Sequence, residues 1–319
     1  MVTLTAYRSF DSKDIYSFIG VTTFAGKYKI SLNDPLGSDL MGKANVSVDY
    51  AGSFKYSEGV LVSGTLRSAT VYANNIKYYE IKGSNDVISY SLYAAGDTNA
   101  FLQYVFSGND IFNGSNSNDY FQFTDSGNDK FFGKAGNDYI ATNIRFKSTV
   151  DGGDGNDFIV SLGEQDSLRG GKGADIFSIR SLISWDKDVI SDFKISDGDA
   201  LTFGFEGFTD IDYNGDGVFD FNQSSGYFEP YENQICIANG SFVNQDSDDY
   251  FIYDLKTGNL YYDYDANGTG YGVGLIVNFS NKPKFTASQI ANDVINIYDS
   301  TQALEPYAIT FFNSNQFGY

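Results

Sequence analysis

Two nine-residue segments near the middle of the chain combine glycines and aspartates in a spacing that suits metal binding. Residues 152–160 read GGDGNDFIV and residues 170–178 read GGKGADIFS, so both fit G-G-x-G-x-D-x-U-x, where U is large and apolar. Such a turn offers carbonyl and carboxylate oxygens in a flexible ring. These hard donors suit calcium, which takes about six to eight oxygen ligands, and do not suit zinc or copper.

The same turn recurs from about residue 105 to residue 178, which indicates a solenoid of stacked units. Weaker copies end at Asp110, Asp119, Asp129, Asp138 and Asp166. The repeat resembles that of the RTX family of calcium-binding parallel β-rolls, found in proteins that Gram-negative bacteria export by type I secretion. The resemblance implies an all-β protein with an RTX β-roll at 107–178, several Ca²⁺ ions as cofactors, and the type I secretion machinery as a partner.

In a β-roll one coil takes two nonapeptides, so turns two repeats apart stack on one edge and share an ion. The first edge consists of the turns 114–119, 133–138, 152–157 and 170–175. The second edge consists of the turns 105–110, 124–129, 143–148 and 161–166. On both edges successive turns start 19, 19 and 18 residues apart, so the register is consistent.

The two edges differ in how well they keep the ligand pattern. The first edge has Asp at the sixth position of every turn, which predicts up to three ions between its four turns. On the second edge the turn 143–148 lacks both the Asp and the fourth-position Gly, and the turn 161–166 has lost two glycines. We therefore expect fewer ions there, or none.

Candidate ligands follow from these turns. On the first edge they are Gly114, Asn116, Asp119, Gly133, Ala135, Gly136, Asp138, Gly152, Gly153, Asp154, Gly155, Asp157, Gly170, Gly171, Lys172, Gly173 and Asp175. On the second edge they are Gly108, Asp110, Gly127, Asp129 and Asp166. One hypothesis for the second edge is that Arg145 or Lys147 supplies fixed positive charge beside Asp129 and Asp166; the alternative is that both cations are solvated surface groups.

A separate acidic loop at residues 212–220 reads DYNGDGVFD and fits the first nine positions of an EF-hand-type loop. Its candidate ligands are Asp212, Asn214, Asp216, Val218 and Asp220. The twelfth position is Gln223 in place of the usual bidentate Glu, which is similar to dockerin-like variants. We expect one structural calcium ion here.

The region after the repeats resembles the C-terminal domain of serralysins. Residues 188–193 read DVISDF and lead into a GDAL turn at 198–201, and residues 253–268 are similar to the terminal hairpin of that domain. The resemblance covers about 107–300 and implies a β-sandwich-like region over 179–319. It also implies an uncleaved export signal within 286–319.

The first 106 residues lack the repeat and form a separate β-rich module in this interpretation. Residues 45–50, 60–62 and 69–72 are typical of strands, with Gly and Asn between them. Residues 96–99 could begin a short helix whose apolar side chains cover the first coil of the solenoid.

Composition excludes several functions. The chain carries 21 Lys+Arg against 41 Asp+Glu, a net charge of −20, so a nucleic-acid partner is not expected. It has no His, which removes His-zinc sites, Ser-His-Asp triads and the H-E-x-x-H protease motif of serralysins.

Cys236 is the only cysteine, so no intrachain disulfide can form; we expect a buried strand thiol. No stretch approaches the ~18 apolar residues of a membrane helix.

The function favoured by these features is non-catalytic. Without a catalytic set, a secreted calcium-binding protein would act by binding a surface, a matrix or surface glycans, or by calcium-dependent self-assembly. An aromatic content of 17% suits such contacts, although Tyr and Phe could simply fill the core. One alternative is a carbohydrate-active hydrolase or lyase that uses N-terminal carboxylates, which are Asp11, Asp14, Asp34, Asp39, Asp49, Glu58 and Glu80. Another is a monomeric calcium-binding effector.

Overall fold

The computed structural model confirms an all-β protein with a parallel β-roll. It describes residues 3–6, 29–32, 46–57, 60–73, 76–89, 106–122, 127–142, 146–162, 165–179, 187–205, 222–224, 227–240, 249–263 and 273–299. The chain forms two compact units, Met1–Gly155 and Asn156–Tyr319. The three-part division at 1–106, 107–178 and 179–319 stays a prediction.

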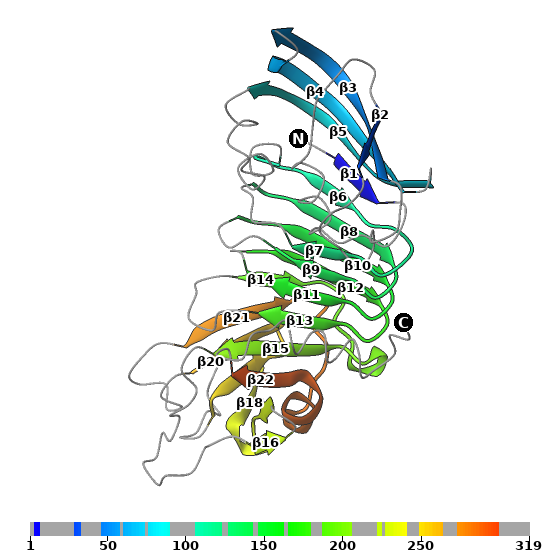
Figure 1. Cartoon of the computed structure of the whole chain (residues 1–319). Coiled ribbons are helices and arrows are strands. Elements are labelled where there is room, and N and C mark those ends of the chain that lie inside the picture. The colour runs from blue at the N-terminus through cyan, green and yellow to red at the C-terminus, as the bar shows by residue number, and fades with distance from the viewer. Residues whose placement is uncertain are drawn as a thin grey trace. The chain divides into compact units, whose positions relative to one another are not determined.

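The first unit begins with an antiparallel sheet (Figure 1). Its strands are β1 (Thr3–Ala6), β2 (Lys29–Leu32), β3 (Val46–Ser57), β4 (Val60–Ala73) and β5 (Ile76–Ser89). Strands β2 to β5 pair in chain order, and β1 pairs with β5. The predicted strands at 60–62 and 69–72 are one strand, because β4 stays paired to both neighbours and its register shifts are absorbed as irregularities.

The first unit continues with coils of the β-roll. One face consists of β6 (Ile111–Asn113), β8 (Lys130–Ala135) and β10 (Thr149–Asp154), and the other of β7 (Tyr120–Gln122) and β9 (Tyr139–Ala141). All pairs within each face are parallel. The U positions of the repeat point inward: Phe112, Phe121 and Phe131 are buried, and the rings of Phe112 and Phe131 stack at 4.8 Å.

The first coil is joined to the N-terminal sheet through β1, which pairs in parallel with β6 and antiparallel with β5. Strand β1 therefore covers the edge that β6 would otherwise expose, as unpaired edges invite aggregation. The predicted capping helix lies outside the described residues, apart from Phe106, one of the apolar residues expected to cover the first coil. Phe106 is buried, and its ring lies 5.4 Å from that of Phe112.

The second unit also has two sheets. One contains β11 (Phe158–Ser161), β13 (Ile176–Ile179), β15 (Ala200–Phe205), β22 (Ile295–Asp299), β17 (Tyr227–Glu229) and β16 (Asn222–Ser224). The other contains β12 (Ser167–Lys172), β14 (Asp188–Ile190), β21 (Gly274–Phe279), β20 (Asn259–Tyr262), β19 (Phe251–Asp254) and β18 (Ile235–Ala238). Among the strands described in this unit, the repeat strands are parallel and the antiparallel pairs lie among the later strands.

Short helical turns connect the later strands. They are the 3₁₀ turns η1 (Ile195–Asp197) and η3 (Glu232–Gln234), the α-helical turn α4 (Ala287–Gln289) and the π-helical turn η4 (Ile290–Val294). The predicted hairpin after residue 253 is present as β19 and β20. Cys236 lies in β18 and is 4% exposed, as predicted. Within the described ranges, no helix has the length and apolar character needed to cross a membrane.

Candidate metal centre

The sixth-position aspartates form ladders that tie each coil to the next. The backbone N–H of Asp119 donates to Oδ1 of Asp138 at 2.7 Å, and that of Asp157 donates to Oδ1 of Asp175 at 2.9 Å. The second edge repeats the arrangement, since the N–H of Asp110 donates to Oδ1 of Asp129 at 2.8 Å. Residues 18 or 19 apart are therefore stacked, as the repeat spacing predicts, and one oxygen of each accepting carboxylate is used to hold the coils together.

The fifth-position residues form a second ladder that runs in the opposite direction. The backbone N–H of Asn137 donates to Oδ1 of Asn118 at 2.8 Å, and the N–H of Asn128 donates to Oδ1 of Asn109 at 2.9 Å. The N–H of Ala174 donates to Oδ1 of Asn156 at 2.9 Å. Sequence reasoning missed these residues, although Asn recurs just before the Asp in five of the turns and was a readable signal.

The glycines allow neighbouring turns to approach closely. Gly136 has φ +114°, and a Cβ there would lie 2.5 Å from the carbonyl carbon of Ser117. At Gly133 a Cβ would collide with Oδ2 of Asp138 and with the carbonyl oxygen of Gly152. The space beside the first glycine of the turn is therefore lined by a carboxylate oxygen and by a carbonyl from the next turn.

The second carboxylate oxygen of the ladder aspartates carries the strongest signal for a ligand. Asp175 is 0% exposed, and its Oδ2 accepts no hydrogen bond although it is buried. Among the described residues the Oδ2 atoms of Asp110, Asp129, Asp138 and Asp157 are also buried and accept no hydrogen bond, while these residues make other contacts. A buried carboxylate oxygen costs free energy unless a donor or a cation compensates it, so a cation fits beside it.

Burial and like charge act together on the carboxyl group of Asp175. Burial is the main cause that raises its pKa, and repulsion from Asp157, Asp199 and Asp192 adds to it, giving a pKa of about 8. Burial also raises the pKa of Asp199 to about 6, against the hydrogen bonds it accepts from the backbone of Asp175 and Lys194. A bound cation would favour the charged form of both groups.

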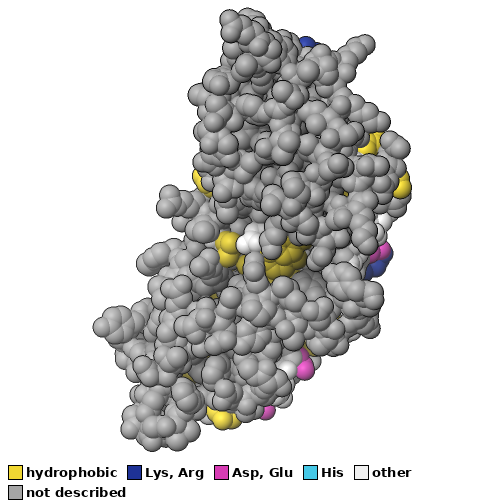
Figure 2. All heavy atoms as spheres, in the orientation of Figure 1, with side chains coloured by type: hydrophobic (Ala, Val, Ile, Leu, Met, Phe, Trp, Pro, Cys, Tyr) yellow, Lys and Arg dark blue, Asp and Glu magenta, His cyan; other side chains and the backbone are white. Residues whose placement is uncertain are grey.

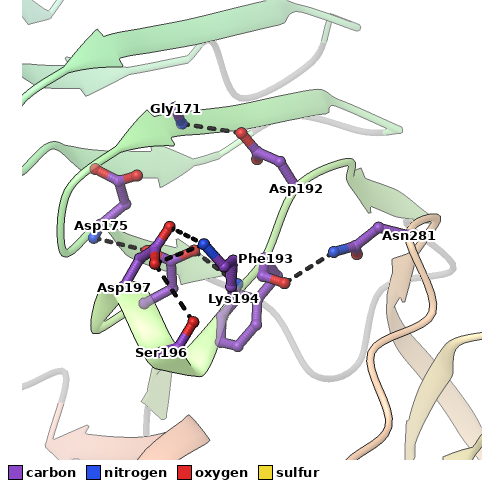
Figure 3. A network of polar contacts seen from close by, with 9 residues as sticks. Gly171, Asp175, Asp192, Phe193, Lys194, Ser196, Asp197 and Asn281 are labelled. Atoms are coloured by element: carbon purple, nitrogen blue, oxygen red, sulfur yellow. Dashed lines mark hydrogen bonds and ion pairs between the residues drawn. The ribbon is translucent and has the colours of Figure 1, made fainter.

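The segment after the last repeat continues the ladders with new residues. Asp199 takes the place of a sixth-position Asp and accepts from the N–H of Asp175 at 3.1 Å. Asp192 accepts from the N–H groups of Gly170 and Gly171 at 3.1 and 3.0 Å, and Figure 3 shows it reaching toward the backbone of Gly171. Lys194 pairs with Asp197 at 2.7 Å. The residues that close this end of the turn stack are therefore themselves acidic.

The later turns of the second edge differ from those of the first, although Asp110 and Asp129 share the buried Oδ2 without a hydrogen bond, so the expectation of fewer ions on this edge stays a prediction. Ser148 stands where the Asp is missing and is fully buried. Near the end of this edge, the hydroxyl of Ser161 lies 2.8 Å from Oδ2 of Asp166 and 2.7 Å from Oδ2 of Asp188. Lys147 is exposed, and its backbone N–H donates to Asn128. Arg145 lies outside the described residues, so the fixed-charge hypothesis for this edge stays a prediction.

The candidate ligands in the turns have three kinds of placement. The sixth-position aspartates are buried, glycines such as Gly127, Gly133 and Gly136 line close approaches between turns, and the third-position side chains of Asn116, Asp154 and Lys172 are exposed. A third-position residue would therefore contribute its carbonyl. The five candidates at 212–220 lie outside the described residues.

No three acidic or Cys side chains converge on one point in the part of the chain that the structure describes. The few described acidic side chains that are visible on the face drawn in Figure 2 lie at separate places. A cation in the turns must therefore combine single carboxylates with backbone carbonyls. Calcium accepts such a mixed oxygen shell, whereas zinc in proteins is held mainly by His and Cys side chains.

Residues 104–140 and 149–178 match the family model of the RTX calcium-binding nonapeptide repeat, in four copies. The gap between the two matched ranges contains the turn 143–148, which has lost the motif. Neither the curated proteins nor the solved structures contain a match to the chain. RTX nonapeptide repeats bind calcium, so Ca²⁺ is the cofactor of this segment.

Proposed function

We propose that this chain is a secreted, non-catalytic protein whose β-roll folds on calcium outside the cell. It then acts by binding a surface or matrix, or by assembling with copies of itself. The observation that carries this proposal is the buried Oδ2 of Asp175, which accepts no hydrogen bond and lies against Gly170 in a glycine-lined turn.

Calcium and folding are coupled through the stacked carboxylates. Without a cation, Asp175 faces repulsion from Asp157, Asp199 and Asp192, so the coil carries an uncompensated electrostatic cost. Extracellular calcium modules are tuned to about 10⁻⁴ to 10⁻³ M. The coil would therefore stay unfolded in a low-calcium cytosol, suitable for export, and fold where calcium is abundant.

The region after the repeats supports the export part of the proposal. Residues 188–201 form β14, η1 and the start of β15, and residues 251–262 form a hairpin. This order of elements fits the proposed likeness to the serralysin C-terminal domain. By the same likeness, the export signal read by the type I machinery lies within 286–319, and the module boundaries fall near 106 and 178.

Charge supports a calcium-dependent contact with other molecules. A net charge of −20 makes two copies of the chain repel each other, and bound or bridging calcium would reduce that repulsion. Tyrosines are abundant, with 25 in the chain, and suit contacts with proteins or glycans.

Sedimentation velocity across a calcium series, from excess chelator to about 10 mM, tests the proposal over the extracellular range. We expect a slow, expanded species in chelator and a compact one in calcium. Large species that appear with calcium and disappear with chelator would support assembly. A compact monomer at every calcium concentration would contradict calcium-coupled folding.

Asp175→Asn tests the residue that carries the proposal. The amide keeps Oδ1 as an acceptor for the N–H of Asp157 but removes the charge from Oδ2. We expect the calcium concentration at half-folding to rise by roughly tenfold or more, as charge-assisted contacts contribute about 1.5 to 3 kcal/mol. The matched control is Asp197→Asn, because Asp197 is exposed and pairs with Lys194. An equal shift in both variants would indicate loss of general negative charge only.

A further inference from the structure

Lys134 occupies an unusual place in the second turn of the first edge. It stands at the second position of the turn 133–138, with φ +78°, in the left-handed region that L-residues adopt only at a cost of about 1 to 2 kcal/mol. Gly153 and Gly171 occupy the same position in later turns and also have positive φ. A lysine is therefore held where the two later turns have glycine and the preceding turn has Ser115.

The side chain of Lys134 reaches back to the preceding turn. Its ammonium group Nζ donates a hydrogen bond to the carbonyl oxygen of Gly114. Gly114 is the first residue of the turn 114–119, and a Cβ there would collide with the carbonyl oxygen of Gly133. The ammonium thus bonds a backbone oxygen beside the place where the two turns meet.

Asp119 is the carboxylate that lines the place where these two turns meet, and it is already hydrogen-bonded. Oδ2 of Asp119 accepts from the N–H of Ser115 at 2.6 Å, and Oδ1 lies 3.2 Å from the hydroxyl of Ser115. In the last turn of this edge, by contrast, Oδ2 of Asp175 accepts no hydrogen bond. The turn 114–119 therefore has local donors where the turn 170–175 has none.

We propose that the ammonium of Lys134 is a tethered cation that replaces calcium between the turns 114–119 and 133–138. An ammonium is a compact positive charge with three donors, so it can bond the carbonyl oxygens that a metal ion would otherwise coordinate. The inference rests on the proposed calcium binding of the other turns and specifies its stoichiometry. The first turn pair of this edge is permanently charged and calcium-independent, while the later turns take ions.

As a consequence, folding of the first edge can begin at its N-terminal end. A tethered charge needs no calcium, so this coil pair can keep its turns together at calcium concentrations that leave later pairs empty. Calcium-driven ordering would then extend from this pair toward the later turns, because each coil contacts its neighbours.

The test is the number of calcium ions bound per chain, measured by equilibrium dialysis of the full chain at saturating calcium and metal analysis of the dialysed protein. Lys134→Gly removes the ammonium and restores the residue type that fits φ +78°. Ser115→Gly combined with Lys134→Gly also removes the local donors to Asp119. The matched control is Lys130→Gln, compared with Lys134→Gln, because Lys130, like Lys134, is an exposed lysine of the same strand, β8.

We expect Lys134→Gly to bind one ion more than the wild type, and Lys130→Gln to bind the same number as the wild type. Lys134→Gln should lower the sedimentation coefficient in chelator more than Lys130→Gln does. An unchanged stoichiometry in Lys134→Gly overturns the inference, and a gain that appears only in the double variant assigns the block to Ser115 and also overturns it. A wild type that binds no calcium would instead contradict the proposed function.

Discussion

Burial controls the charge of the turn aspartates when no cation is bound. Asp175 is enclosed, accepts one backbone hydrogen bond and is repelled by three other carboxylates, and its pKa is raised from 3.8 to about 8. A turn that stays folded without calcium would therefore hold this proton at neutral pH. A calcium ion must displace it, because only the charged carboxylate is a good ligand.

The pH dependence follows from this raised pKa. Between about pH 4 and pH 8 the folded calcium-free chain holds a proton that the unfolded chain lacks, so its stability falls as pH rises through that window. Calcium affinity changes in the opposite sense and should increase by up to about tenfold per pH unit until about pH 8. In an osmolyte that keeps the calcium-free coils folded, calorimetric calcium titrations at pH 6, 7 and 8 measure the affinity, and urea denaturation of the calcium-free chain measures its stability.

The control for this prediction is Asp175→Asn, which has no titrating group at this position. Its calcium midpoint should depend less on pH than that of the wild type. Titrations in two buffers with different ionisation enthalpies should also show less proton release from this variant. A wild-type affinity that does not change between pH 6 and pH 8 would contradict the assigned proton displacement.

The stacked turns depend on glycines that serve two different physical needs. Some glycines only supply a left-handed backbone, while others also leave room for the next turn. Gly108 and Gly136 have nearly the same φ, +108° and +114°, but a Cβ at Gly108 meets nothing within 4 Å. At Gly136 the Cβ would meet the backbone of Ser117 and Asn118.

The two alanine variants separate these needs. Gly108→Ala should lose stability only through backbone strain, about 1 to 2 kcal/mol. Gly136→Ala should lose about 1 to 3 kcal/mol more, because the adjacent turn must shift to make room. Urea denaturation at saturating calcium gives both values, and equal losses would show that the approach of the turns at Gly136 is not limiting.

Calcium acts on the whole molecule by changing the balance between negative charge and packing. The chain has 20 more acidic than basic groups, and several of its aspartates are buried in the ladders. Apolar side chains of the coils, such as Phe112 and Phe121, can pack only if the free-energy cost of burying those aspartates between the turns is offset. Removing calcium should therefore loosen the coils rather than only empty a surface site.

Metal exchange provides the test at this scale. Excess chelator should reduce the β-sheet signal in circular dichroism, and calcium should restore it. Magnesium at the same concentration should fail to restore it, because Mg²⁺ requires near-octahedral geometry at about 2.0 to 2.1 Å and gives up its water reluctantly. Full recovery with magnesium would indicate that general charge screening is sufficient, and a sodium chloride series at matched ionic strength checks that outcome.

The repeat pattern alone is enough to predict the class of the fold, the stacking partners and the metal. A period of 18 or 19 residues places each turn over the next, so Asp119 with Asp138 and Asp157 with Asp175 could be paired before any coordinates. The oxygen-only donor set identified calcium for the same local reason. These properties repeat along the chain, and repetition makes a weak local signal strong.

Three-dimensional packing sets how each turn uses its donors. The period places Lys134 over Ser115, but it does not say that the ammonium bonds the carbonyl of Gly114 or that Asp119 is bonded by Ser115. The repeat period also does not reveal that β1 pairs with β6, because the four residues of β1 lie outside the repeats. Such contacts depend on side-chain torsions and on pairing between segments distant in sequence, and neither is encoded in a local pattern.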